Sequence, residues 1–162
     1  WTFNLQKGVR MEKIAYTDSH TLWVDAAKNR IYCTMSGNKF PEQTTFVQDW
    51  KKAAQLVSHG FTVLVDVTRF RIMSLGWIET ALKTQKILRD AGLAATAEIV
   101  PEHVFIEMES YGILDMSGFE ERKIFVRRDE AEAWLDAHSV TTYLQGGSYA
   151  RDRQNPHLHV NR

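Results

Sequence analysis

Residues 61–67 read Phe-Thr-Val-Leu-Val-Asp-Val, and this stretch decides the fold class. It is short and rich in β-branched side chains. Both its odd and its even positions carry apolar residues, so a strand built from it has no polar face. Such a strand is typical of the middle of a parallel sheet, where both faces are covered. Gly60 stands just before it, where a preceding helix would end in a left-handed residue. The stretch therefore predicts an α/β fold.

Amphipathic segments flank this strand on both sides. Apolar residues at helical spacing predict one helix between residues 44 and 60 and another between residues 75 and 92. The later elements are a strand over 93–100, a short helix over 103–111, a strand over 123–126 and a helix capped by Asp129. Strands separated by helices in this way pair in parallel through right-handed crossovers.

A hairpin is predicted before the first helix. Residues 22–24 form an apolar run, residues 31–35 alternate between apolar and polar, and a polar loop joins them. The hairpin adds an antiparallel edge to the parallel strands. The predicted fold is thus α/β, a mixed sheet of N-terminal hairpin plus parallel strands, with about four packed helices.

The 162 residues fit one domain with extensions. We expect an N-terminal extension over 1–10, the α/β domain over 11–138 and a polar C-terminal tail over 139–162. The tail is either a flexible end with one short docked segment or an arm that pairs with a second subunit. An unpaired hairpin edge is a template for association, so edge and tail together favour a homodimer.

Composition excludes several classes of function. Twenty basic and twenty acidic side chains give a formal net charge of zero, which argues against nucleic acid as the partner. No apolar run approaches the roughly 18 residues of a membrane span. No secretory signal is visible, so we expect a cytoplasmic protein. The single cysteine excludes an intramolecular disulfide and a cysteine-rich zinc module.

The residues do not form a recognisable catalytic constellation. Cys33 lies in a predicted strand and is interpreted as a small buried hydrophobe. Nucleophile elbow, phosphate-binding loop and dinucleotide fingerprint are all missing from the sequence. Asp66, at the end of a buried strand, is where α/β enzymes often place a carboxylate, but it more commonly ties down the next loop. We therefore expect a non-catalytic protein without a cofactor.

His103 and Glu107 are four residues apart, so a helix would place both on one face. A zinc site usually needs a third protein ligand, and none stands at a recognisable spacing. The tail offers His157 and His159, but nothing in the sequence places them near His103. The sequence predicts solvated helix residues here and no metal site.

Three marks in order resemble the STAS domain, the fold of sulphate transporters and anti-sigma-factor antagonists, and its SpoIIAA-like relatives. Residues 60–68 are similar to the family's central strand, which ends in an aspartate and a small hydroxyl residue. Leu75-Gly76 opens the next helix, and residues 128–135 (RDEAEAWL) are similar to the closing helix. The resemblance covers about residues 21–138 and implies a regulatory domain that binds a protein partner.

The family's phosphorylation switch is not expected in this chain. An ungapped match sets the turn Asp-Ser-Ser-Gly-Leu-Gly of sporulation-type antagonists against residues 71–76, which places Arg71 on the aspartate and Met73 on the phosphorylated serine. A thioether cannot accept phosphate. Ser74, where the family has glycine, is either the N-cap of the following helix or a hydroxyl that welcomes an anion there.

Two functions remain open, and both use the end of the central strand. The first is a non-catalytic interaction domain that binds a protein partner or itself. The alternative, implied by similarity to lipid-binding relatives, is a small apolar, lipid-like ligand held beside the same turn, since Met and aromatic side chains suit an adaptable partner. In a third interpretation the apolar side chains simply cover the core. The candidate binding residues are Asp66, Thr68, Phe70, Ile72, Met73, Ser74 and Trp77.

Overall fold

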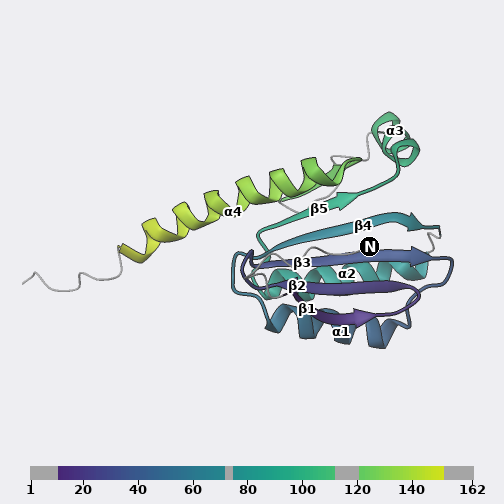
Figure 1. Cartoon of the computed structure of the whole chain (residues 1–162), viewed down its shortest axis with the longest axis horizontal. Coiled ribbons are helices and arrows are strands. Elements are labelled where there is room, and N and C mark those ends of the chain that lie inside the picture. The colour runs from purple at the N-terminus through teal and green to yellow at the C-terminus, as the bar shows by residue number, and fades with distance from the viewer. Residues whose placement is uncertain (1–10, 72–74, 112–120, 152–162) are drawn as a thin grey trace, which may run out of the picture.

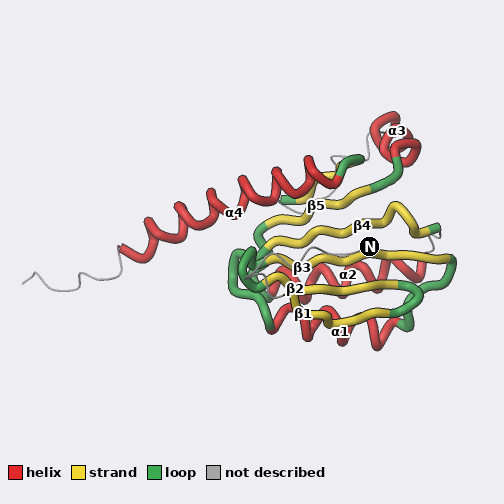
Figure 2. Tube along the Cα trace, in the orientation of Figure 1, coloured by secondary structure: helices red, strands yellow, loops and turns green. Residues whose placement is uncertain are grey.

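A computed structural model of the chain describes residues 11–71, 75–111 and 121–151. Within the helices, the side chains of residues 75–78 and 140–151 lie outside this description. Figures 1 and 2 show a twisted sheet with helices on both of its faces. No helix in the described ranges combines the length and the apolar character that crossing a bilayer requires.

The sheet has six strands that lie side by side in their order along the chain. They are β1 (Met11–Tyr16), β2 (His20–Asp25), β3 (Arg30–Gly37), β4 (Thr62–Phe70), β5 (Ala95–Ile99) and β6 (Arg122–Phe125). The first three pair antiparallel, and β3 to β6 pair in parallel. The predicted mixed sheet of antiparallel and parallel strands is confirmed.

The four helices of the described residues divide between the two faces. They are α1 (Gln43–Gln55), α2 (Leu75–Asp90), α3 (Glu102–Ser110) and α4 (Arg128–Arg151). One buried cluster joins Val63 of β4 to α1 and α2, and the other joins Leu64 of the same strand to Leu135 of α4. Successive residues of β4 thus enter opposite cores, which is why its sequence has no polar face.

One strand was not predicted. β1 pairs outside β2, so β1, and not the hairpin over residues 22–35, forms the antiparallel edge of the sheet. Its pairing shifts between Lys13 and Ala15, where a bulge leaves Ile14 as the extra residue. A strand is identified in a sequence by side chains that alternate between its two faces. The bulge interrupts this two-residue alternation, so the strand could not be recognised from the sequence.

The last helix extends into the range that the sequence suggested as a C-terminal tail. α4 continues to Arg151, so residues 139–151 are helical and no helix end stands at residue 138. Figure 1 shows this part of α4 extending past the sheet. Gly146-Gly147 argued against a helix, because each glycine costs about 1 kcal/mol relative to alanine. A helix already nucleated against the sheet, however, adds a hydrogen bond with each further residue. Residues 152–162, like the predicted extension 1–10, lie outside the described residues.

A buried arginine fastens α4 to the sheet. Arg30, only 1% exposed, places Nη1 2.6 Å from Glu132 Oε2 and Nη2 2.9 Å from Asp136 Oδ1. Its Nε donates to Thr62 Oγ1 at 2.9 Å. The Tyr32 hydroxyl donates to Glu132 at 3.2 Å, and burial with the charge of Glu132 raises the pKa of Tyr32 to about 12. The phenol therefore remains a donor at neutral pH.

The N-terminus of α1 is capped by Glu42. Its carboxylate accepts hydrogen bonds from the backbone N–H groups of Thr44, at 3.0 Å, and Thr45, at 2.7 Å. The pKa of Glu42 is lowered to about 2 by these hydrogen bonds, chiefly those from the side chain and the N–H of Thr45.

The Glu42→Gln variant should lose an acid-sensitive part of the stability. Because the folded-state pKa of Glu42, about 2, lies below the ordinary 4.5, the charged cap stabilises the fold above pH 4.5 and loses this effect as the pH falls toward 2. Urea midpoints at about pH 7 and about pH 3 measure it. We expect wild type to be more stable than the variant at the higher pH, with the difference shrinking at the lower. An equal difference at both would contradict the capping role.

Candidate functional site

A large cavity lies on the side of the sheet that carries α1 and α2. Its volume is about 1010 Å³, and its walls come from β3 to β6 and from the helices α1, α2 and α3. Side-chain alternation explains the sheet wall, because every second residue of β3 and β4 faces this side. Its apolar lining includes Met35, Trp50, Val65, Val67, Phe70 and Leu88.

Within the described part of the chain, two polar atoms in the cavity wall lack a hydrogen-bond partner. Trp50 lines the cavity from α1 and is 3% exposed, and its indole Nε1–H has no hydrogen-bond acceptor among the described residues. Gln85 lines it from α2, and its buried Oε1 has no donor there either. Leaving a buried donor or acceptor unpaired costs about 1–3 kcal/mol. Both residues line the cavity, but these two atoms themselves are buried within its wall.

The β5–β6 part of the wall is polar but internally paired. Arg122 forms an ion pair with Glu98, in which Nε donates to Oε2 at 3.0 Å, and both side chains are about three-quarters buried. Because each charge is matched by the other, this pair leaves no net charge on the wall. The cavity is therefore largely apolar, with a neutralised polar strip along one side.

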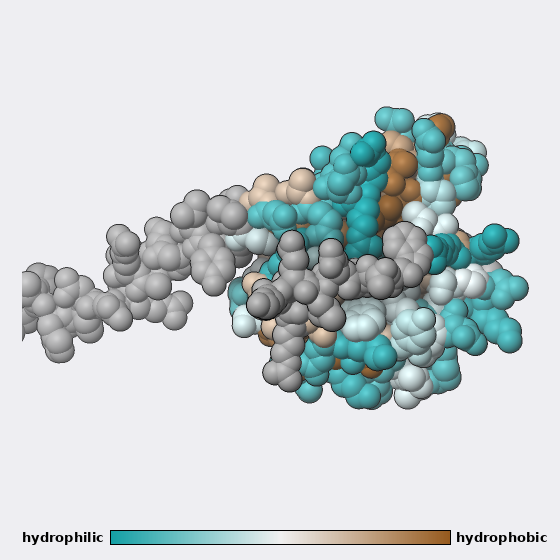
Figure 3. All heavy atoms as spheres, viewed as in Figure 1, coloured by the Kyte–Doolittle hydropathy of each residue, from teal (hydrophilic) through white to brown (hydrophobic). Residues whose placement is uncertain are grey.

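α3 borders the cavity without being packed into a core. None of its residues is buried, while Val104 and Met108 line the cavity and Ile106 is 57% exposed. Figure 3 shows apolar surface gathered beside this helix, on a face that is otherwise mostly hydrophilic. His103 lines the cavity too, but no group of three metal-binding side chains forms within residues 11–71, 75–111 and 121–151.

The end of β4 is shaped by a bulge. Thr34 pairs with Asp66 and Ser36 with Arg69, so β4 carries one residue more than β3 over this interval. Asp66 Oδ1 accepts hydrogen bonds from the N–H of Thr68, at 3.0 Å, and from its hydroxyl, at 2.6 Å. Asp66 thus fixes the backbone that follows it, as expected for a carboxylate at this position.

The structure brings together two of the predicted site residues at the cavity. β4 continues to Phe70, past the predicted end at residue 67, so Thr68 and Phe70 belong to the strand and not to the turn. Both line the cavity, and the ring of Phe70 packs edge-on against Phe40 with centroids 5.8 Å apart. Ile72, Met73 and Ser74 lie outside the described residues, as does the side chain of Trp77 within α2.

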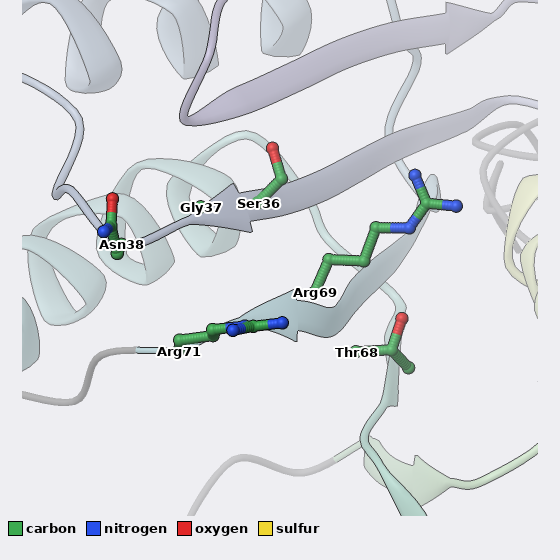
Figure 4. A pocket seen from close by; sticks show the side chains of 6 residues that line it. All are labelled: Ser36, Gly37, Asn38, Thr68, Arg69 and Arg71. Carbon is green, nitrogen blue, oxygen red and sulfur yellow. The ribbon is translucent and has the colours of Figure 1, made fainter.

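A second, open cleft of about 480 Å³ lies where β3 and β4 end. It is lined by Ser36, Gly37, Asn38, Thr68, Arg69 and Arg71 (Figure 4). Gly37 has φ +83°, a conformation that favours glycine, and its carbonyl accepts the N–H of Arg71 at 3.2 Å. Neither Arg69 nor Arg71 forms an ion pair within the described part of the chain, and sequence reasoning had given neither a binding role.

Cys33 is buried in the cavity wall at 1% exposure. Burial, with a smaller contribution from the charge of Asp66, raises the pKa of its thiol well above the ordinary value. The sulfur therefore stays protonated at neutral pH and is a poor nucleophile, which agrees with its interpretation as a small hydrophobe.

A buried histidine was missed by the sequence reasoning. His20 is 2% exposed, with Nε2 3.2 Å from Asp49 Oδ2 and Nδ1 within 3.2 Å of the hydroxyls of Thr17 and Ser19. These contacts tie α1 to the β1–β2 turn. Its partners come from the adjacent turn and a helix 29 residues away, so no spacing in the sequence could identify them.

No family model matches any part of this chain, and no curated protein matches its sequence.

Proposed function

We propose that this chain is a non-catalytic binding domain that holds a small, largely apolar molecule between the sheet, α2 and α3. The cavity of about 1010 Å³ is the observation that carries this proposal. Sites for small organic ligands are concave, mostly apolar and typically about 300–1,000 Å³ in volume. This cavity has that character and lies at the upper end of that range.

The packing of protein interiors supports an occupant. Cores are as dense as organic crystals, and empty spaces larger than a water molecule are few. The side chains of Val65, Val67 and Phe70 are only partly buried, although they pack against a core whose other members are almost inaccessible. A ligand on this wall would remove their surface from water, at about 25 cal/mol for each Å² covered.

The unpaired polar atoms bear on the polarity of the proposed ligand. A purely aliphatic ligand would leave Trp50 Nε1 and Gln85 Oε1 unsatisfied. Because both atoms are buried in the wall, a ligand with a hydroxyl, carbonyl or amide group could pair with either one only if that side chain turned toward the cavity. We therefore expect a molecule that is apolar over most of its length but carries hydrogen-bonding oxygen or nitrogen.

A second candidate is the STAS-like, SpoIIAA-like interaction domain, in which a protein partner docks where β4 ends. What supports it is the order of the elements and the accessibility of this end, since Thr68, Arg69 and Arg71 are all exposed. Chain self-association as a homodimer and a cytoplasmic location belong to this candidate. They remain expectations from the sequence.

Native mass spectrometry of gently purified protein distinguishes the two candidates. We expect a co-purifying small molecule, or a rise in the melting temperature with members of a lipid panel, because a ligand that binds only the folded state stabilises it. A bare chain that shows no thermal shift with any lipid would contradict ligand binding. A substitution that fills the cavity should abolish the thermal shift caused by the lipid. Docking of a protein partner at the exposed end of β4 would not depend on such a substitution.

A further inference from the structure

The cavity and the open cleft meet at the end of β4. Thr68 and Arg71 line both spaces, whereas Arg69 lines only the cleft. An elongated molecule whose apolar part lies in the cavity can therefore bring one end beside Arg71. The chemistry of the cleft then decides what that end must be.

Arg71 has no carboxylate at ion-pair distance among the residues that the structure describes. Arg30, Arg122, Arg127 and Arg128 each lie within 4 Å of a carboxylate, but within the described ranges Arg71 forms no such pair. A guanidinium at the rim of an apolar cavity favours carboxylate or phosphate oxygens, which it binds with two parallel hydrogen bonds.

Three other donors in the cleft are already engaged. The Thr68 hydroxyl donates to Asp66, the Ser36 hydroxyl donates to the carbonyl of Asp18, and the N–H of Arg71 donates to Gly37. The Asn38 amide also lines the cleft, but it carries no charge, so the preference for an anion depends on the guanidinium groups. Figure 4 shows Arg71 extending toward the side where Thr68 lies, while the guanidinium of Arg69 points away from it.

We propose that the ligand is a single-chain amphiphile, with its tail in the cavity and an anionic head, a carboxylate or a phosphate, bound by Arg71. This proposal rests on the proposed function and adds the chemical class of the ligand. Arg69 contributes only to the general positive charge of the cleft. The two arginines thus supply a matched pair, because both are exposed and differ in whether they line the cavity.

Displacement of the uncharged dye Nile red tests the head group. Dodecanoate, dodecyl phosphate and the neutral dodecanol are compared at neutral pH on wild type, Arg71→Gln and Arg69→Gln. In wild type we expect one of the anions to displace the dye at about tenfold lower concentration than dodecanol, the effect of one charge-assisted contact. Arg71→Gln should remove this preference and leave dodecanol unchanged. Arg69→Gln should retain most of it.

The outcomes separate this proposal from the proposed function. If dodecanol displaces Nile red as well as both anions in wild type, the anionic head is wrong while ligand binding stands. If Nile red does not bind at all, the proposed function fails first. If both substitutions reduce the preference equally, general charge and not Arg71 selects the anion. Inorganic phosphate alone should not displace the dye, because it has no tail, and displacement by it would contradict the amphiphile.

Discussion

The double variant Glu132→Gln, Asp136→Asn should lose about 3–5 kcal/mol of unfolding free energy, the cost of leaving a buried charge without its partner. Arg30 is 1% exposed and pairs with both carboxylates, at 2.6 and 2.9 Å. The substitutions keep the shape of both side chains and remove only their charges. The guanidinium then keeps its hydrogen bond to Thr62 but is left between β3 and α4 without a counter-charge. Urea unfolding at constant protein concentration measures the loss.

Two further variants make this prediction specific. Glu79→Gln with Asp90→Asn also removes two paired carboxylates, but these are 70% and 64% exposed on α2. Exposed ion pairs contribute about 0–1 kcal/mol each, so this control should change little. Arg30→Met should be less harmful than the Glu132 and Asp136 substitutions, because it removes the buried charge itself. Equal losses in the two double variants would show that Arg30 does not hold α4.

Val65→Trp should weaken binding of an apolar ligand at least about tenfold, because the indole would occupy space that the ligand needs. Val65 lines the cavity from β4 and is only partly buried. Val126→Trp is the control, since Val126 is 36% exposed and does not line the cavity. Nile red titrations of the three proteins give the dissociation constants.

The same variant tests the cavity through stability. Adding bulk to a filled core forces side chains off their rotamers and costs about 1–3 kcal/mol. If the space beside Val65 is open, Val65→Trp should instead leave the urea midpoint nearly unchanged. If Val65→Trp lost much stability while Val126→Trp folded normally, the space beside Val65 would already be filled by other side chains.

The sequence was sufficient for the elements whose patterns are local. The β4 stretch was recognisable because Val63 and Leu64 enter opposite cores, which removes any polar face. β1 was hidden by its bulge at Ile14, and the continuation of α4 was hidden by Gly146-Gly147. In both cases tertiary pairing or helix propagation outweighed the local signal.

Less of the candidate site could be predicted, because most of its residues come together only in the folded structure. Thr68 and Phe70 were predicted as binding residues because the carboxyl ends of parallel strands commonly bind ligands, and both line the cavity. Trp50 and Gln85 belong to different helices, and only the packing of α1 beside α2 places both on one cavity. Arg71 had been considered only as a departure from a family motif. The role proposed for Arg71 depends on the lack of an ion-pair partner within the described residues, which no sequence pattern records.

Titration of Nile red into the purified wild-type chain tests the central claim most directly. Occupation of the cavity predicts saturable binding of one dye for each chain, with the blue-shifted emission of an apolar environment, displacement by dodecanol and at least about tenfold weaker binding to Val65→Trp. Emission that stays at its value in water, or binding that is the same in wild type and Val65→Trp, would contradict the claim that this cavity is a ligand site.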